Sequence, residues 1–315
     1  MKDCGKRTSY HPNRTVIDPD LCDGCGLCVV VCPLRSLALR DGKAVVTGKY
    51  SLGCDQCAAV CPREAVSTGL VDDNALTLTT IQNDEAWIPY GQFDTAALVR
   101  LIRSRRSCRS FSDTPMPRQV LDDLVKIGAM APSGHNTQTW QFTVLPDRAS
   151  VGKLALAVGE FFRRLNRLAE KRIARLFARL FLSDVLGDYY RRHYAIVKEG
   201  LRQWDEFGRD TLFWGAPAAL VMSSQKHPDN SGKDVLLASQ NILLAAHAMG
   251  YASCFIGFAV NAMAHDRKIA RALGIPDDEE VLAVIALGRS DVRYHRVTRR
   301  RRVLPRYCFG VTPSA

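Results

Sequence analysis

Apolar residues along the last two-thirds of the chain follow two patterns. At some places they recur at helical spacing, which predicts helices at 94–103, 118–130, 234–249 and 267–273. At others they form short continuous runs, which predict buried strands at 141–145, 218–222, 254–256 and 281–287. Asp94 stands where the N-cap of the first helix is expected. Strands separated by helices in this way predict an α/β or α+β core with helices on both faces.

A long helical stretch, residues 151–204, interrupts this core after its first strand. Its apolar residues recur at near-helical spacing opposite a face rich in arginine and lysine. We interpret it as an amphipathic excursion that covers the core with its arginines solvated, in preference to a docking surface. The polar segment 71–92 is interpreted as a linker, and its Trp87 and Tyr90 predict that it packs against another part of the chain.

Seven cysteines near the N-terminus have a spacing that repeats. Residues 22–33 read C-x2-C-x2-C-x3-C-P, and residues 54–62 repeat the last three of these cysteines and the proline, 29 positions later. A repeat of this kind predicts a pair of related half-units. The pattern resembles the bacterial two-cluster ferredoxin over residues 14–70. Cysteines two apart also suit zinc, although zinc sites rarely use three cysteines at intervals of three followed by Cys-Pro.

The ferredoxin resemblance implies two 4Fe–4S clusters with crossed ligands. The ligands of the first would be Cys22, Cys25, Cys28 and Cys61. The second would have only three cysteines, namely Cys32, Cys54 and Cys57. Ser51 stands at the repeat position of Cys22, where a cysteine is expected. The fourth ligand of the second cluster is then Ser51, Cys4 or solvent, and a cluster without a firm fourth ligand is prone to become 3Fe–4S.

Length and composition indicate a globular protein of 315 residues with two domains. We assign a ferredoxin-like domain to 1–70 and a larger domain to 93–315, joined by the linker. Cluster thiolates need a reducing compartment, and residues 1–7 lack the apolar core of a signal peptide, so we expect a cytoplasmic protein. The most apolar window, 241–260, contains His247 and is interrupted by Gly250, which predicts buried helix and strand rather than a membrane span.

The formal net charge of +11 is compatible with binding to nucleic acid, to an acidic redox partner or to an anionic cofactor. No zinc-finger, RNA-recognition or helix-turn-helix pattern accompanies the arginines, so we expect no nucleic-acid partner. One basic segment combines guanidinium groups, which bind phosphate bidentately, with a hydroxyl donor: Arg105, Arg106, Ser107 and Arg109. An exposed basic loop would have the same composition, so this segment alone does not decide between the two. The chain has no GxGxxG after a strand and no P-loop.

Further short motifs follow this segment in a fixed order. Arg-Arg-Ser-x-Arg-x-Phe at 105–111 is followed by Ala-Pro-Ser-Gly-x-Asn at 131–136, Gly-Ala-Pro at 215–217, Phe-Ile-Gly-Phe at 255–258 and Leu-Gly-Ile-Pro at 273–276. Over about 93–302 the ordered set resembles the nitroreductase family of FMN enzymes, in the branch with an N-terminal ferredoxin module. The resemblance implies an α+β fold, with a mixed sheet flanked by helices, and a homodimer with two FMN sites at its interface.

The resemblance also implies which residues hold FMN. The phosphate and pyrimidine edge would be bound by Arg105, Arg106, Ser107 and Arg109. The segment that reaches FMN from the partner subunit would contain Pro132, Ser133, Gly134 and Asn136. Ile256 and Gly257 match the backbone over the flavin near N5, and Arg300 matches an arginine that closes on the phosphate. No side chain receives a catalytic role, because the chemistry takes place on the flavin.

Two kinds of electron carrier on one chain predict an oxidoreductase. An external donor, either a reduced ferredoxin-like protein or NAD(P)H, would supply the electrons. The acceptor would be a small organic molecule such as a nitro, quinone, enone or halogenated compound. Three alternatives remain open: an electron-transfer protein with no small substrate of its own, an iron–sulfur sensor that binds DNA, and a flavoenzyme that oxidises a substrate and reduces a ferredoxin.

Overall fold

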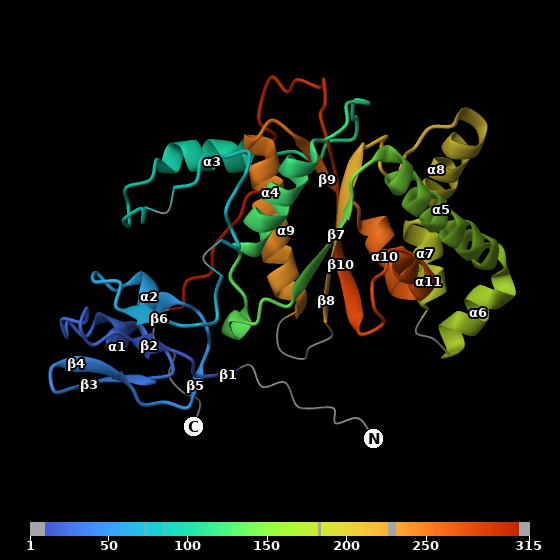
Figure 1. Ribbon diagram of the computed structural model, residues 1–315. Coiled ribbons are helices and arrows are strands. Elements are labelled where there is room, and N and C mark those ends of the chain that lie inside the picture. Colours follow the sequence, from blue (N-terminus) through green and yellow to red (C-terminus); the bar gives the residue numbers. More distant parts are fainter. Residues whose placement is uncertain (1–9, 73, 85, 182–183, 226–230, 309–315) are drawn as a thin grey trace.

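The computed structural model describes residues 10–308 apart from 73, 85, 182–183 and 226–230. Cys4, one of the candidate cluster ligands, therefore lies outside the described residues. Figure 1 shows a small N-terminal module beside a larger unit in which helices cover both faces of one sheet. Within the described residues, no helix is both long enough and apolar enough to span a membrane.

The central sheet has four strands in the order β7-β8-β10-β9. Their bounds are β7 (Trp140–Leu145), β8 (Ala218–Gln225), β9 (Ala252–Phe255) and β10 (Glu279–Gly288). All three pairings are antiparallel, and a parallel element is supplied by an isolated bridge between Ser107 and Ser253 beside β9. Three strands contain the run predicted from sequence, and β9 overlaps the predicted run 254–256 but ends at Phe255, so the four strand predictions are confirmed apart from that one-residue boundary.

The central strands are buried on both faces, which explains their continuous apolar runs. Along β8, Ala219 and Val221 belong to one core cluster, whereas Leu220 and Met222 belong to the other. This is the alternation expected of a strand. The second of these clusters is completed by α4 (Arg118–Ala129) and α9 (Ser231–Ala248), and the first by α5 (Arg148–Glu170), α10 (Gly257–His265) and α11 (Arg267–Ala272). The predicted helices are present, beginning with α3 (Thr95–Ser104), whose N-cap is Asp94.

The excursion is divided more finely than its sequence pattern predicts. Instead of one long stretch it contains α5, α6 (Arg172–Phe181), α7 (Val185–Arg192) and α8 (Tyr194–Phe207). The backbone is extended at Lys171, where α5 ends. Helix α10 was not predicted, because it is apolar on most sides and a buried helix of this kind has no amphipathic period.

The linker is held by hydrogen bonds and not by its aromatic residues. The backbone N–H groups of Thr79 and Thr80 donate to the fully buried carboxylate of Asp123 on α4, at 2.8 and 2.6 Å. Burial raises the pKa of Asp123, but these hydrogen bonds outweigh it, so the pKa lies below its ordinary value. The linker therefore packs against the larger domain as predicted, although through Thr79 and Thr80, because Trp87 and Tyr90 contact each other and are 75% and 93% exposed.

The N-terminal module repeats its backbone as well as its cysteines. Its helices α1 (Leu27–Val31) and α2 (Gln56–Ala59) begin 29 residues apart, at 27 and 56. Two strand pairs complete it: β2 (Val16–Ile17) with β6 (Val66–Ser67), and β3 (Leu37–Arg40) with β4 (Lys43–Val46). A third short pair, β1 (His11–Pro12) with β5 (Tyr50–Ser51), sets His11 opposite Ser51. The predicted half-unit repeat is confirmed.

Two helical glycines give a test of how tightly the core is packed. A Cβ atom at Gly128 of α4 would lie 2.8 Å from Ile242 Cδ1 and 3.2 Å from Phe142 Cε1, whereas one at Gly152 of α5 would meet nothing within 4 Å. Overpacking costs about 1–3 kcal/mol and the helix propensity of alanine returns at most about 1 kcal/mol. Gly128→Ala should therefore lower the thermal unfolding midpoint and Gly152→Ala should raise it slightly. A rise in both variants would contradict the packing described.

Candidate cofactor and cluster sites

The arginine-rich segment lies along the edge strand β9. It follows α3 directly, and the Cys108 N–H donates to the Ser253 carbonyl at 2.9 Å beside the bridge between Ser107 and Ser253. Burial raises the pKa of the Cys254 thiol, while Arg109 and Arg105 nearby oppose the shift. Ile256 and Gly257 come directly after β9. Two segments that are about 150 positions apart in the sequence, both predicted to bind FMN, therefore meet at one edge of the sheet.

Positive charge is concentrated there. Burial is the main reason that the pKa of Arg105 is lowered, and the charges of Arg106 and Arg300 lower it further. Arg300 thus comes close to Arg105 although almost 200 residues separate them. Arg106 Nη1 is buried without a hydrogen-bond partner, and so is Ser253 Oγ. A buried donor on a charged group is costly until it is paired, so these groups fit an anion such as a phosphate.

Arg109 is arranged differently from the other three predicted residues of this segment. It is exposed, and its guanidinium lies over the ring of Trp214, 5.4 Å from the ring centre. Trp214 precedes the Gly-Ala-Pro motif and has a left-handed backbone with φ of 52°. Neither Trp214 nor Ser253 was singled out in the sequence. The left-handed tryptophan could not be read from its neighbours, and Ser253 lies within an apolar strand.

The third predicted segment lies elsewhere in the protomer. It contains the short helix η1 (Gly134–Asn136), and the Gly134 N–H donates to the buried Asp234 carboxylate of α9 at 3.2 Å. His135 and Asn136 both have positive φ, 52° and 54°, a conformation that costs non-glycine residues energy. Within the described part of one protomer, no hydrogen bond joins this segment to the arginines. That it reaches FMN from a second subunit stays a prediction.

This segment instead contacts the N-terminal module. The Asn136 side chain donates from Nδ2 to the Gly53 carbonyl at 2.9 Å, and the rings of His135 and Tyr10 meet edge to face at 6.0 Å. Gly53 directly precedes Cys54. A residue predicted to touch the flavin is therefore bonded to the loop that carries a predicted cluster ligand.

The cysteines predicted for the first cluster surround the small core of the module. Cys22 and Cys28 are buried and Cys25 is exposed. Burial raises the pKa of Cys28, and the charges of Cys22 and Cys25 add to the rise. The Ala44 and Ala65 N–H groups point at the sulfurs of Cys22 and Cys61, each at 3.4 Å. Such donors stabilise a thiolate.

The residues predicted for the second cluster line a single small cavity: Cys32, Cys54, Cys57 and Ser51. The Ser36 N–H points at Cys32 Sγ at 3.4 Å, which repeats the contact made by Ala65 with Cys61 29 residues later. Ser51 Oγ accepts from the Gly53 N–H at 3.0 Å. The fold thus places Ser51 beside the three cysteines, as the repeat predicts. No three His, Cys, Asp or Glu side chains in the described ranges gather closely enough to hold one metal ion.

Comparison with known proteins gives the family. The nitroreductase family matches residues 102–289, and the 4Fe-4S binding domain matches residues 15–36. A 4-nitrobenzoate reductase from Pseudomonas putida is 28% identical over 208 residues, which cover 61% of this chain and 84% of that protein. A chloronitrobenzene nitroreductase from Comamonas testosteroni is 26% identical over 204 residues, covering 61% and 86%.

Among solved structures, the FMN-dependent nitroreductase NfnB from Mycobacterium smegmatis in complex with NADPH is 24% identical, with a TM-score of 0.44. The alignment covers 66% of this chain and 99% of that one. The nitroreductase match spans more than half of the 315 residues. The protein therefore belongs to the nitroreductase family and carries a 4Fe–4S binding domain near its N-terminus.

Proposed function

We propose that this protein is an FMN-dependent oxidoreductase that receives electrons through two iron–sulfur clusters and reduces a small organic acceptor. The observation that carries the proposal is the cluster of arginines that lies beside β9. Arg105, Arg106 and Arg300 lie together there, and a guanidinium nitrogen of Arg106 is buried without a partner. A phosphate would neutralise the cluster and accept from that nitrogen.

The chain offers each part of an FMN site. Arg105, Arg106 and Arg300 would hold the phosphate, with the hydroxyls of Ser107 and Ser253 as further donors. The backbone of Ile256 and Gly257 would lie against the ring system. When bound, FMN takes up one or two electrons and passes hydride to an organic acceptor. The protein's own tasks are to hold the phosphate, orient the ring and limit the access of water.

Relatives support the acceptor class and the choice of donor. Two of them are named for 4-nitrobenzoate and chloronitrobenzene, which favours a nitro compound among the nitro, quinone, enone and halogenated acceptors. An Archaeoglobus fulgidus relative is named for NADH dehydrogenase and NAD(P)H nitroreductase activity and a Thermus thermophilus relative is named NADH dehydrogenase, which favours NAD(P)H. The 4Fe–4S domain adds a reduced ferredoxin-like protein as a second possible donor.

A homodimer is part of the proposal. Helix α3 has no buried residue in the protomer, and the apolar residues Leu98 and Ile102 are 40% and 48% exposed. A second copy that covers this face would remove the apolar surface from water. It would also allow the segment 132–136 to complete the partner's FMN site, because that segment is not bonded to the arginines of its own protomer.

The proposal is tested by absorption spectra of anaerobically purified protein, before and after addition of NADPH or reduced ferredoxin. Flavin and cluster absorption should both bleach, and 4-nitrobenzoate or 9,10-phenanthrenequinone should restore the oxidised spectrum. Reduction by a donor without reoxidation by any small acceptor would contradict the proposed enzyme and favour an electron-transfer protein.

Arg105→Ala should lower flavin affinity without unfolding the protein. Loss of one charge-assisted contact to phosphate costs about 1.5–3 kcal/mol, or roughly ten- to hundredfold in affinity. The measurement is the dissociation constant of FMN for the apoprotein, by flavin fluorescence. Arg118→Ala, which removes an exposed arginine on α4, serves as the matched control and should bind FMN normally. Equal FMN affinity in the two variants would show that the arginine cluster does not bind the FMN phosphate.

Ser51→Cys should give the two clusters equal stability in air, which we expect to differ in the native protein. A serine hydroxyl gives up its proton far less readily than a thiol, so iron is held less firmly there. In the native protein we expect one robust 4Fe–4S cluster and one that falls to 3Fe–4S on exposure to air. EPR spectra with iron analysis measure the difference, and the variant should show two air-stable clusters.

Two outcomes would separate the alternatives for this ligand. Two equally stable 4Fe–4S clusters in the native protein would contradict the assignment of Ser51. If Cys4→Ser alone creates the labile cluster, the fourth ligand is Cys4 and Ser51 is not involved.

A further inference from the structure

A large chamber lies between the excursion and the sheet. Its volume is about 1810 Å³. Most pockets for drug-sized ligands measure about 300–1,000 Å³. Helices α5 to α8 form its outer wall, and the residues that follow β9 form its inner wall together with Trp214 and Arg109. Figure 1 shows these helices grouped on the face of the sheet opposite α4 and α9.

Aromatic side chains form much of the chamber wall. The rings of Phe162 and Phe258 meet at 5.4 Å in a T-shaped arrangement, and Tyr189 stacks on Phe162 at 6.4 Å. Two tryptophans, Trp204 and Trp214, also face the chamber. Aromatic and aliphatic walls of this kind favour a ligand with flat apolar faces.

Some charged residues of the wall are paired, whereas Arg109, Lys171 and Arg172 have no acidic partner in the described part of the chain. Arg163 contacts Asp205 at 2.5 Å, and Asp188 contacts Arg192 at 2.7 Å. The Tyr189 hydroxyl donates to Asn166 at 2.7 Å, and burial raises its pKa to about 12, so it stays neutral. An uncharged aromatic group loses little on leaving water for the apolar part of this wall.

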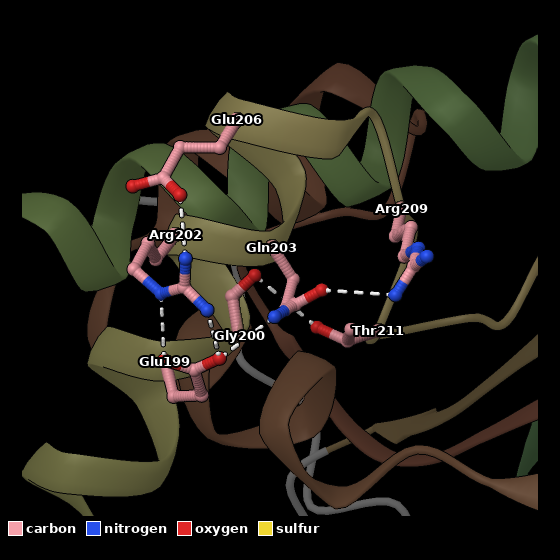
Figure 2. Close-up of polar contacts among 7 residues, drawn as sticks. All are labelled: Glu199, Gly200, Arg202, Gln203, Glu206, Arg209 and Thr211. Atoms are coloured by element: carbon pink, nitrogen blue, oxygen red, sulfur yellow. Dashed lines mark hydrogen bonds and ion pairs between the residues drawn. The ribbon is translucent and has the colours of Figure 1, made fainter.

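The outer wall is held in place by its own polar contacts. Figure 2 shows Arg202 on α8 between Glu199 and Glu206, at 2.8 and 2.5 Å. Hydrogen bonds from Arg202 lower the pKa of Glu199, which lines the chamber, to about 2. At the other side of α8 the Thr211 hydroxyl donates to the Gly200 carbonyl at 3.3 Å. These contacts fix the turn of α8 that faces the chamber.

The inner end of the chamber coincides with the proposed FMN site. Arg109, Ile256 and Gly257 belong to both. Gly257 is exposed, and a Cβ atom built there would meet nothing within 4 Å, so open space lies directly in front of it. A molecule in the chamber can therefore approach the backbone that would lie against the flavin ring.

We propose that the chamber binds a large polycyclic aromatic acceptor, such as a multi-ring quinone or nitroarene, with its reducible group toward Ile256 and Gly257. This inference rests on the proposed function for its chemistry. Conversion of a quinone to a hydroquinone there would consume two electrons from the external donor and two protons. A single-ring acceptor such as 4-nitrobenzoate would fill only a small part of the space.

Pyrene tests binding separately from reduction, because it is polycyclic, inert to reduction and changes its emission in apolar surroundings. The holoenzyme should bind about one pyrene per protomer, with energy transfer from the wall tryptophans. Val197→Trp fills the chamber from α8 and should weaken binding by about tenfold or more, as expected when the shape of an apolar pocket changes. Ala195→Trp, on the same helix but outside the chamber, is the matched control. Failure of the native protein to bind pyrene would overturn the proposal.

A second pair of variants addresses folding and the competing occupant. Phe177 lines the mouth of the chamber and Leu180 does not, yet both are exposed on α6, so Asp at either position is tolerated by the fold. Phe177→Asp should weaken pyrene binding and Leu180→Asp should not. If instead both variants alter the sedimentation coefficient and neither alters pyrene binding, the α6 face is a contact between copies and the proposal is wrong.

Steady-state kinetics complete the test. Val197→Trp should lower kcat/KM for 9,10-phenanthrenequinone by a larger factor than for 4-nitrobenzoate. An equal loss for both would overturn the proposal that the chamber binds large acceptors. Pyrene binding without turnover of any acceptor would support the chamber as an aromatic site and contradict the proposed enzyme activity.

Discussion

The charges of Arg106 and Arg300 lie close to the partly buried Arg105, and this repulsion is the main electrostatic constraint at the edge of the sheet beside β9. Three guanidinium groups do not remain close and partly buried unless other interactions hold them there. The bridge between Ser107 and Ser253 holds the first segment against β9, and the C-terminal tail brings Arg300 back to it. An anion bound there would relieve the repulsion, and the buried nitrogen of Arg106 would be free to donate to it.

The chamber lies at the same edge of the sheet as the arginine cluster. Cys254 of β9 lies near the charges of Arg105 and Arg109, and the next residues, 255–258, line the chamber. On that face the buried core residues come from α5, α10 and α11, and the further helices of the excursion pack against them through Tyr189, Val197, Leu201 and Trp204. Their charged residues are largely paired with one another. The excursion therefore combines a solvated outer face with a chamber on its inner face.

Sequence patterns predicted those features of the structure that depend on residues close together in the chain. Helix periods, apolar runs, the Asp94 cap and the cysteine repeat depend on neighbouring residues, and each has its counterpart in the structure. The contacts that create the sites depend on distant residues. Nothing local in Thr79 or Thr80 predicts a bond to Asp123, and nothing local in Asn136 predicts a bond to Gly53. The chamber, likewise, exists only because four helices turn back toward the sheet, and the turns at Lys171 and beyond carry weak sequence signals.

The hydrogen bond between Asn136 and Gly53 also bears on how such a protein can evolve. Gly53 has a φ of 61°, and a Cβ atom there would lie 3.1 Å from Leu70, so its carbonyl is aimed by a backbone that few residues can reproduce. Asn136 is likewise held in a left-handed conformation. A ferredoxin module exchanged by recombination would have to present its carbonyl at the same place. The junction between the two domains therefore depends on the backbone conformation at both positions, although each domain resembles a module found in other proteins.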